Sequence, residues 1–225
     1  MKRAEPTPIG DGRHLRLLAA LAGAAIGITA CSTAVYQRGD RAAGSTETTA
    51  SHVQVERQAL TSAMTTLSNL VEKPAPDLRP GFDAFSSALD TLIAAAKTSE
   101  AKARQMAHSN DVFFTEWDKQ LTSITNLDIR RRSATRRNES STQFRAVNER
   151  YLQAQDQLRS LISYLEDLRR ALRNDLTRSG LASARPLVAN ASAVADSVQG
   201  DLGQARSDLS SLRAEMSSVP GPARP

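Results

Sequence analysis

Residues 144–172 read FRAVNER YLQAQDQ LRSLISY LEDLRRA L when they are written in rows of seven. The first column holds Phe144, Tyr151, Leu158, Leu165 and Leu172, and the fourth holds Val147, Ala154, Leu161 and Leu168. Every one of these positions is apolar. Apolar residues that alternate three and four apart form one face of an α-helix that packs lengthwise against another helix. The pattern therefore predicts a long helix with a continuous buried seam.

The preceding segment has the same rhythm from Phe82 to Leu127. Its two columns contain Phe82, Leu89, Ala96, Ala103, Asn110, Trp117 and Ile124, and then Phe85, Leu92, Ser99, Met106, Phe113, Gln120 and Leu127. We interpret the polar exceptions Ser99, Asn110 and Gln120 as partly exposed, the alternative being contacts that set the register of a bundle. Turn residues at 125–128 predict a short connection, so two arms of about 45 residues, near 68 Å each, fold back as antiparallel neighbours.

A shorter helix is expected on the N-terminal side of this hairpin. Ser51 and Gln54 have the spacing of a capping box, and apolar residues then recur at helical intervals up to about Val71. Three prolines within residues 73–81 end the helix, because proline removes a backbone donor and restricts the residue before it.

A last helix is expected after the breakers Gly180 and Pro186. Its columns contain Val188, Ala195, Leu202, Leu209 and Met216, and then Ala191, Val198, Ala205 and Leu212. Gly200 and Gly203 lie inside this helix and cost about 1 kcal/mol each relative to alanine. They either permit close helix approach or mark a soft spot, and we favour the soft spot.

The composition agrees with an all-α protein. Of 225 residues, 40% are hydrophobic but only 4% aromatic, and there is a single cysteine, which excludes a disulfide scaffold and a thiolate zinc cage. We predict an elongated antiparallel bundle of about four helices over residues 51–217, built on a long central helical hairpin, and a disordered tail at 218–225. An intermolecular coiled coil is the alternative, but the short connections favour a bundle within one chain.

The N-terminus resembles a bacterial lipoprotein signal peptide over residues 1–30. Four basic residues precede an uncharged run at 17–30 that is too short, at about 21 Å, to cross a bilayer. The run ends in Ile-Thr-Ala before Cys31, as in the lipobox, where the cysteine sulfur accepts a diacylglyceryl group. Since Ser32 is not the aspartate associated with inner-membrane retention, we expect the periplasmic face of the outer membrane, or the inner membrane if sorting differs.

The residues after the acylated Cys31 are small and polar up to Ala50, without apolar periodicity. We interpret residues 31–50 as a flexible tether with a reach of roughly 25 Å. Three acyl chains on the mature N-terminus exceed the two that lasting membrane attachment requires.

The sequence lacks the groups that common catalytic chemistries require. His14 leaves with the signal peptide, and neither His52 nor His108 has a second histidine three or four residues away. No phosphate-binding loop and no nucleophile elbow occurs, and Glu116 and Asp118 lie on different helix faces. We therefore expect no enzyme activity, no cofactor, no metal, no small-molecule substrate and, for an envelope protein, no nucleic acid.

The basic residues gather at the predicted hairpin tip. Residues 130–173 carry eleven arginines and five acids, and five of those arginines fall in the first turns of the second arm: Arg130, Arg131, Arg132, Arg136 and Arg137. Their charge is unfavourable there, because the N-terminal end of a helix is itself positive. Folding back places them near Phe113, Phe114 and Trp117. Cation-π packing and pairing with Asp111, Glu116 and Asp118 is the ordinary explanation, and an anion-binding tip is the functional one.

Several motifs together resemble a bacterial family of domains of unknown function, number 2959. They are Phe113-Phe114-x-Glu116-Trp117-x-x-x-Leu121, then Asn126-x-x-Ile129-Arg130-x-x-Ser133-x-x-Arg136-Arg137, with Tyr151 and Leu176-Thr177-x-x-Gly180 downstream. The resemblance covers about Val53 to Met216. It implies an all-helical fold, often with a lipoprotein signal, and makes Glu116, Trp117, Arg130 and Ser133 the signature positions, but it implies no activity.

From these features we predict a lipid-anchored periplasmic helical scaffold or interaction protein of unknown biochemical activity. Its partners are the membrane, through the N-terminal lipid anchor, and a protein or an anionic cell-envelope polymer. The alternative is a surface binder in which the arginine-rich tip engages anionic lipid headgroups or peptidoglycan.

Overall fold

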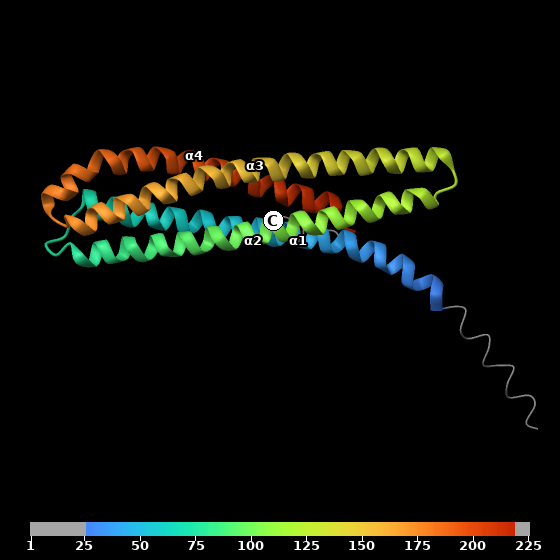
Figure 1. The fold of residues 1–225 in the computed structure, drawn as a ribbon, viewed down its shortest axis with the longest axis horizontal. Helices are drawn as coiled ribbons and strands as arrows, with labels where there is room; N and C mark the ends of the chain where they lie inside the picture. The colour runs from blue at the N-terminus through green and yellow to red at the C-terminus, as the bar shows by residue number, and fades with distance from the viewer. Residues whose placement is uncertain (1–25, 219–225) are drawn as a thin grey trace, which may run out of the picture. The chain divides into compact units, whose positions relative to one another are not determined.

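The computed structural model describes the backbone of residues 26–218 and the side chains of residues 37–218, so the predicted signal peptide and tail lie largely outside the described residues. The described part contains four helices and no strand: α1 (Ile26–Glu72), α2 (Arg79–Ser123), α3 (Leu127–Asn174) and α4 (Arg178–Met216). The chain divides into two units, Met1–Gln37 and Arg38–Pro225. The prediction of an all-α bundle is confirmed for the second unit, whose helices run side by side in Figure 1.

The core of this bundle is formed by most of the predicted seam positions, but Leu127, predicted as the last seam residue of the first arm, is exposed and begins α3. All nine heptad positions of α3 are buried, and Leu158 and Leu165 have no exposed surface. They pack into one hydrophobic cluster to which all four helices contribute, including Leu60 of α1, Leu89 of α2 and Leu202 of α4. Burial of a leucine side chain contributes roughly 2 kcal/mol, so the shared seam supplies most of the driving force for folding.

The connections are as short as the sequence predicts. α1 ends at Glu72 before the proline-rich segment, and the Asn126 side chain caps α3 by accepting hydrogen bonds from the backbone N–H groups of Asp128 and Ile129 at 3.0 and 3.1 Å. Thr177 caps α4 in the same way through the N–H of Gly180 at 3.0 Å. Each cap satisfies donors that have no partner inside the helix, so it fixes where the helix begins.

α4 therefore begins before the residues that we expected to precede it. Both Gly180 and Pro186 lie inside the helix. A Cβ at Gly180 would clash with the backbone of Asp175, which explains the glycine. Pro186 is exposed, so the carbonyl that loses its partner is solvated, and burial of Leu181 and Val188 on either side offsets the cost of about 3 kcal/mol.

The flexible tether predicted for residues 31–50 is wrong, and so is a helix start at Ser51. α1 is helical from Ile26 onward, and Ala42, Thr46 and Thr49 are completely buried. The hydroxyls of the two threonines donate to the carbonyls of Ala42 and Ser45, both at 2.9 Å, so their burial leaves no donor without a partner. Small side chains here allow close packing where the sequence lacks an apolar rhythm.

The expected partial exposure of the polar heptad positions of α2 is also wrong for two of them. Ser99 and Asn110 are completely buried, while Gln120 is exposed as predicted. The Asn110 amide donates to the carbonyl of Met106 at 3.0 Å. The hydroxyl of Ser99 lies 3.1 Å from the hydroxyl of Tyr151 on α3. These hydrogen bonds replace part of what the side chains lose to water, but the Asn110 Oδ1 is buried without a partner among the described residues.

One end of the bundle carries the hairpin connection. Here Arg38, at the start of the second unit, forms an ion pair with Glu116 at 2.9 Å, and a Cβ on Gly39 would lie 3.4 Å from the ring of Phe113 and 3.9 Å from the carbonyl of Met216. α2 continues ten residues beyond Phe113, about 15 Å of helix. Figure 1 shows the α2–α3 hairpin reaching beyond the end of α4.

Candidate functional site

The hairpin tip, residues 113–137, is braced across its two arms by aromatic side chains. The indole Nε1 of Trp117 donates to the hydroxyl of Ser133 at 3.0 Å. The Phe113 ring lies 5.5 Å from the Trp117 ring and 5.2 Å from the Phe114 ring, and Phe114 lies 6.2 Å from Phe144 of α3, all in the tilted arrangement that aromatic pairs favour. Trp117 and Phe114 thus contact the second arm, whereas the ring contacts of Phe113 are with Phe114 and Trp117 of its own arm.

Arg137 has the ordinary structural role considered for the basic cluster. Its guanidinium lies 5.5 Å from the centre of the Phe114 ring and donates to Asp118 at 2.6 Å. It also donates to Ser141 at 3.4 Å. Arg137 therefore joins α2 to α3 by a cation-π contact and an ion pair.

The ordinary explanation expected Glu116 to pair with the arginines of α3, but the structure pairs it with other residues. It contacts Arg38 at 2.9 Å and Lys119 at 3.6 Å. Desolvation alone would raise the pKa of Glu116, but the charges and hydrogen bonds of Arg38 and Lys119 outweigh it and lower that pKa. Glu116 thus ties the first residue of the second unit to the base of the tip.

The other four arginines of the cluster have no close acidic partner among the described residues. Arg131 reaches Asp128 at only 4.0 Å, and both side chains are mostly exposed. Within the described part of the chain, Arg130, Arg132 and Arg136 have neither an ion pair nor a side-chain hydrogen bond. Arg137 therefore holds the hairpin together, whereas the other four arginines form no close contact that would brace it.

The core contains a polar layer that the sequence analysis missed. Glu56 of α1 and Ser99 of α2 have no exposed surface, and Tyr151 and Gln155 of α3 are nearly as buried. The Gln155 amide donates to the two carboxyl oxygens of Glu56 at 2.9 and 2.8 Å, and the hydroxyls of Ser99 and Tyr151 lie 3.1 Å apart.

The acidity of this layer follows from its burial. Desolvation raises the pKa of Glu56 to about 7, although hydrogen bonds from Gln155 and Ser99 act in the opposite direction. Desolvation also raises the pKa of Tyr151, so this phenol stays neutral at physiological pH. Glu56 lies three residues after Val53 and four before Leu60, at a heptad position, and that placement of a carboxyl was the available sequence signal.

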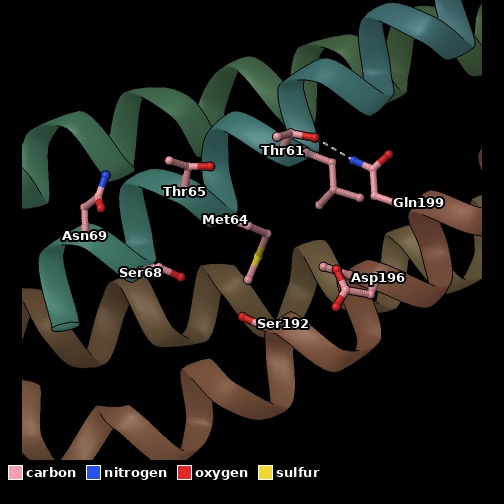
Figure 2. Close-up of a pocket in the computed structure, with 10 residues that line it drawn as sticks. Thr61, Met64, Thr65, Ser68, Asn69, Ser192, Asp196 and Gln199 are labelled. Carbon is pink, nitrogen blue, oxygen red and sulfur yellow. Dashed lines mark hydrogen bonds between the residues drawn. The ribbon is translucent and has the colours of Figure 1, made fainter.

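Among the surface hollows along the described bundle, one lies beside the polar layer and another lies between α1 and α4. One, of about 330 Å³, is lined by Tyr151 and Gln155 but by neither Glu56 nor Ser99, so the carboxyl of the polar layer is closed off from it. Figure 2 shows the other, of about 340 Å³ between α1 and α4, where Gln199 donates to the Thr61 hydroxyl at 3.0 Å. Its lining contains one carboxylate and no cation, so it offers no charge pair to a ligand.

The described residues also limit other kinds of site. Over residues 37–218, no three side chains among histidine, cysteine, aspartate and glutamate gather as a metal ion would require. The helices of the described part include none that is both long and apolar enough to cross a bilayer. The side chain of the predicted lipidation site, Cys31, lies outside the described side chains.

The second unit is thus a four-helix bundle with a sealed polar layer and a protruding, arginine-rich hairpin. The chain belongs to the family described as "Protein of unknown function (DUF2959)", whose model matches residues 35–219. The match extends further toward the N-terminus than the resemblance from Val53, and it includes the buried part of α1 that was expected to be a tether. No curated protein and no solved structure matched the chain.

Proposed function

We propose that this protein is a lipid-anchored scaffold or interaction protein on the periplasmic face of the outer membrane, without enzymatic activity. The anchor is Cys31, which follows an uncharged run and a lipobox-like Ile-Thr-Ala. The bundle begins at Arg38, seven residues later (38 − 31 = 7). Seven residues span at most about 25 Å, so an anchor at Cys31 keeps that end of the bundle close to the bilayer.

The observation that carries this proposal is which end of the bundle follows the anchor. Arg38 pairs with Glu116 at 2.9 Å, at the base of the hairpin tip. The loops at the opposite end, after Glu72 and Asn174, lie a helix length away. Acylation at Cys31 would therefore hold the tip, and its four unused arginines, at the membrane side. A body that presents one charged end in a fixed direction suits interaction rather than catalysis.

The polar layer supports a role without catalysis. In this layer Glu56 has a raised pKa and Ser99 lies beside it, and neither has any exposed surface. A catalytic acid or nucleophile must come within hydrogen-bonding reach of a substrate, which these two groups cannot do in this conformation.

The anchor is tested by metabolic labelling with radioactive palmitate in the bacterial host. We expect label in the wild-type chain and in Ser32→Ala, and none in Cys31→Ala. Sucrose-gradient separation of the membranes should then place the labelled protein in the outer-membrane fraction. Equal labelling of Cys31→Ala, or unprocessed protein in the cytosol, would refute the proposal.

A further inference from the structure

We propose that the hairpin tip is a membrane-contacting element, in which Leu127 and Ile129 enter the headgroup region of an anionic bilayer while the neighbouring arginines bind lipid phosphates. This inference deepens the proposed function, which supplies the bilayer, and assigns the tip its partner. Four observations on the described residues support it: two exposed aliphatic side chains, an uncompensated charge, a rigid support and the position of the tip.

The first observation is the exposure of two aliphatic residues at the start of α3. Leu127 and Ile129 are 55% and 58% exposed, the largest fractions among the exposed large hydrophobic residues of the described chain. They lie in the first turn of α3, next to the loop, and Ile124 on the other side of that loop is half-buried. The core takes no part in their burial, so the fold alone does not explain why they are apolar.

The second observation is the charge that surrounds this apolar pair. The hairpin tip, residues 113–137, carries six basic residues and three acids, a net charge of +3 (6 − 3 = 3). Arg130, Arg132 and Arg136 have no acidic partner among the described residues, and Arg131 has only a distant one. Their position at the positive end of the α3 dipole adds to the cost of leaving them uncompensated. An anionic surface removes that cost.

The third observation is that the tip is held in shape before it meets a partner. The Trp117–Ser133 hydrogen bond at 3.0 Å and the Arg137–Asp118 ion pair at 2.6 Å join the two arms just behind the exposed residues. Asn126 caps α3 inside the loop. The apolar pair is therefore presented by a closed hairpin, and little conformational entropy is lost when it binds.

The fourth observation is the end of the bundle on which the tip lies. Arg38 begins the second unit beside the base of the tip, seven residues after the proposed acylation site. An anchored chain therefore has its tip within reach of the headgroups. Aliphatic side chains beside arginines suit the bilayer interface, where apolar and charged groups are accommodated together. A hydrated acidic polysaccharide would engage the arginines but would gain nothing from Leu127 and Ile129.

The experiment uses the full-length chain with Cys31→Ser, which removes the only native thiol and the acyl anchor. Ile129→Cys is added and labelled with an environment-sensitive fluorophore. The matched control carries the label at Leu187→Cys on α4, which is also exposed, at 43%, but lies toward the other end of the bundle. Each protein is mixed with vesicles of phosphatidylglycerol and phosphatidylethanolamine, with zwitterionic vesicles, or with purified peptidoglycan.

We expect a blue shift of the label at residue 129 with the anionic vesicles only, weakening as salt rises, and no shift of the label at residue 187. Replacing Arg130, Arg131 and Arg132 by glutamine should weaken vesicle binding by about fivefold per arginine. Circular dichroism checks that this variant stays helical. Because the label reports locally, attachment through the N-terminal segment does not imitate the expected result.

Three results would overturn the inference. These are no shift at residue 129 while the protein sediments with the vesicles, equal shifts at residues 129 and 187, or a response to peptidoglycan without one to vesicles. Each leaves the palmitate result unaffected, since the labelled chain lacks Cys31. Loss of palmitate incorporation with a retained tip response would instead refute only the anchor.

Discussion

The buried carboxyl of Glu56 makes the stability of the bundle depend on pH in a way that a single substitution removes. Burial disfavours the charged form and raises the pKa of this carboxyl from its ordinary value of 4.5 to about 7 in the folded chain. In the Glu56→Gln variant the one remaining oxygen still accepts from Gln155 while the second acceptor is lost, and the proton equilibrium at this position is removed.

The direction in which the free energy of unfolding changes with pH depends on whether the folded or the unfolded chain binds the proton. Between about pH 4.5 and about pH 7 the folded chain binds a proton at Glu56 that the unfolded chain releases, so the free energy of unfolding falls as the pH rises through this window. Below the window both states are protonated and there is no penalty. Above it the full penalty applies, about 3 kcal/mol for a shift of this size.

The assay is urea unfolding followed by circular dichroism, at about pH 4 and about pH 8. Relative to wild type, Glu56→Gln should gain about 3 kcal/mol on going from the lower to the higher pH. The matched control is Glu149→Gln, an exposed glutamate of α3 whose substitution should leave the wild-type pH profile unchanged. Parallel pH profiles for wild type and Glu56→Gln would refute the assignment of a buried, raised-pKa carboxyl.

Three further predictions concern the packing. Leu158→Ala, at a fully buried seam position, should lower the free energy of unfolding by about 2–5 kcal/mol, whereas Leu152→Ala, 51% exposed on the same helix, should change it by less than about 0.5 kcal/mol; equal effects would contradict the seam. Gly200→Ala should raise the melting temperature by several degrees because nothing lies within 4 Å of its new Cβ, and Gly203→Ala should raise it less because its Cβ meets an arginine guanidinium at 3.3 Å; a larger gain at Gly203 would count against this packing. Trp117→Phe should lower the free energy of unfolding by about 1 kcal/mol, because the indole hydrogen bond is lost. Backbone amides of the tip should then exchange hydrogen faster, and unchanged exchange would contradict a braced tip.

The helices that could be predicted from the sequence are those with large apolar seam residues. The α3 seam consists mostly of leucine and aromatic residues, and every predicted position is buried. The first half of the bundled part of α1 was missed because its seam has the same spacing but small or polar residues. Counted back in sevens from Val53 and Glu56, this seam consists of Gly39, Ala42, Thr46 and Thr49, all of them buried. Hydrophobic periodicity reveals a seam of large apolar residues, but a seam of small or polar residues gives no such signal even when it is closely packed.

At the hairpin tip, too, the sequence predicted some contacts and not others. The aromatic brace followed from the spacing of Trp117 and the arginines, because an antiparallel hairpin brings equidistant residues together. The pairing of Asp118 with the basic cluster also followed, since Asp118 pairs with Arg137, but the partner of Glu116 did not: it is Arg38, from a segment that was interpreted as a tether. Long charged side chains choose among several neighbours in three dimensions, and the sequence spacing of one hairpin contains no information about a third helix.

The central claim is that the hairpin tip and the start of the bundled α1 lie at the same end. Nitroxide labels on Arg41→Cys and Lys119→Cys, in the full-length Cys31→Ser chain, measure this directly by pulsed electron resonance, with Arg41→Cys and Leu176→Cys as the reference pair. The structure predicts a short, narrow distance distribution for the first pair and a distance of about 58 Å, the length of α4, for the second. A broad distribution for the first pair, or a distance as long as that of the reference, would contradict the claim.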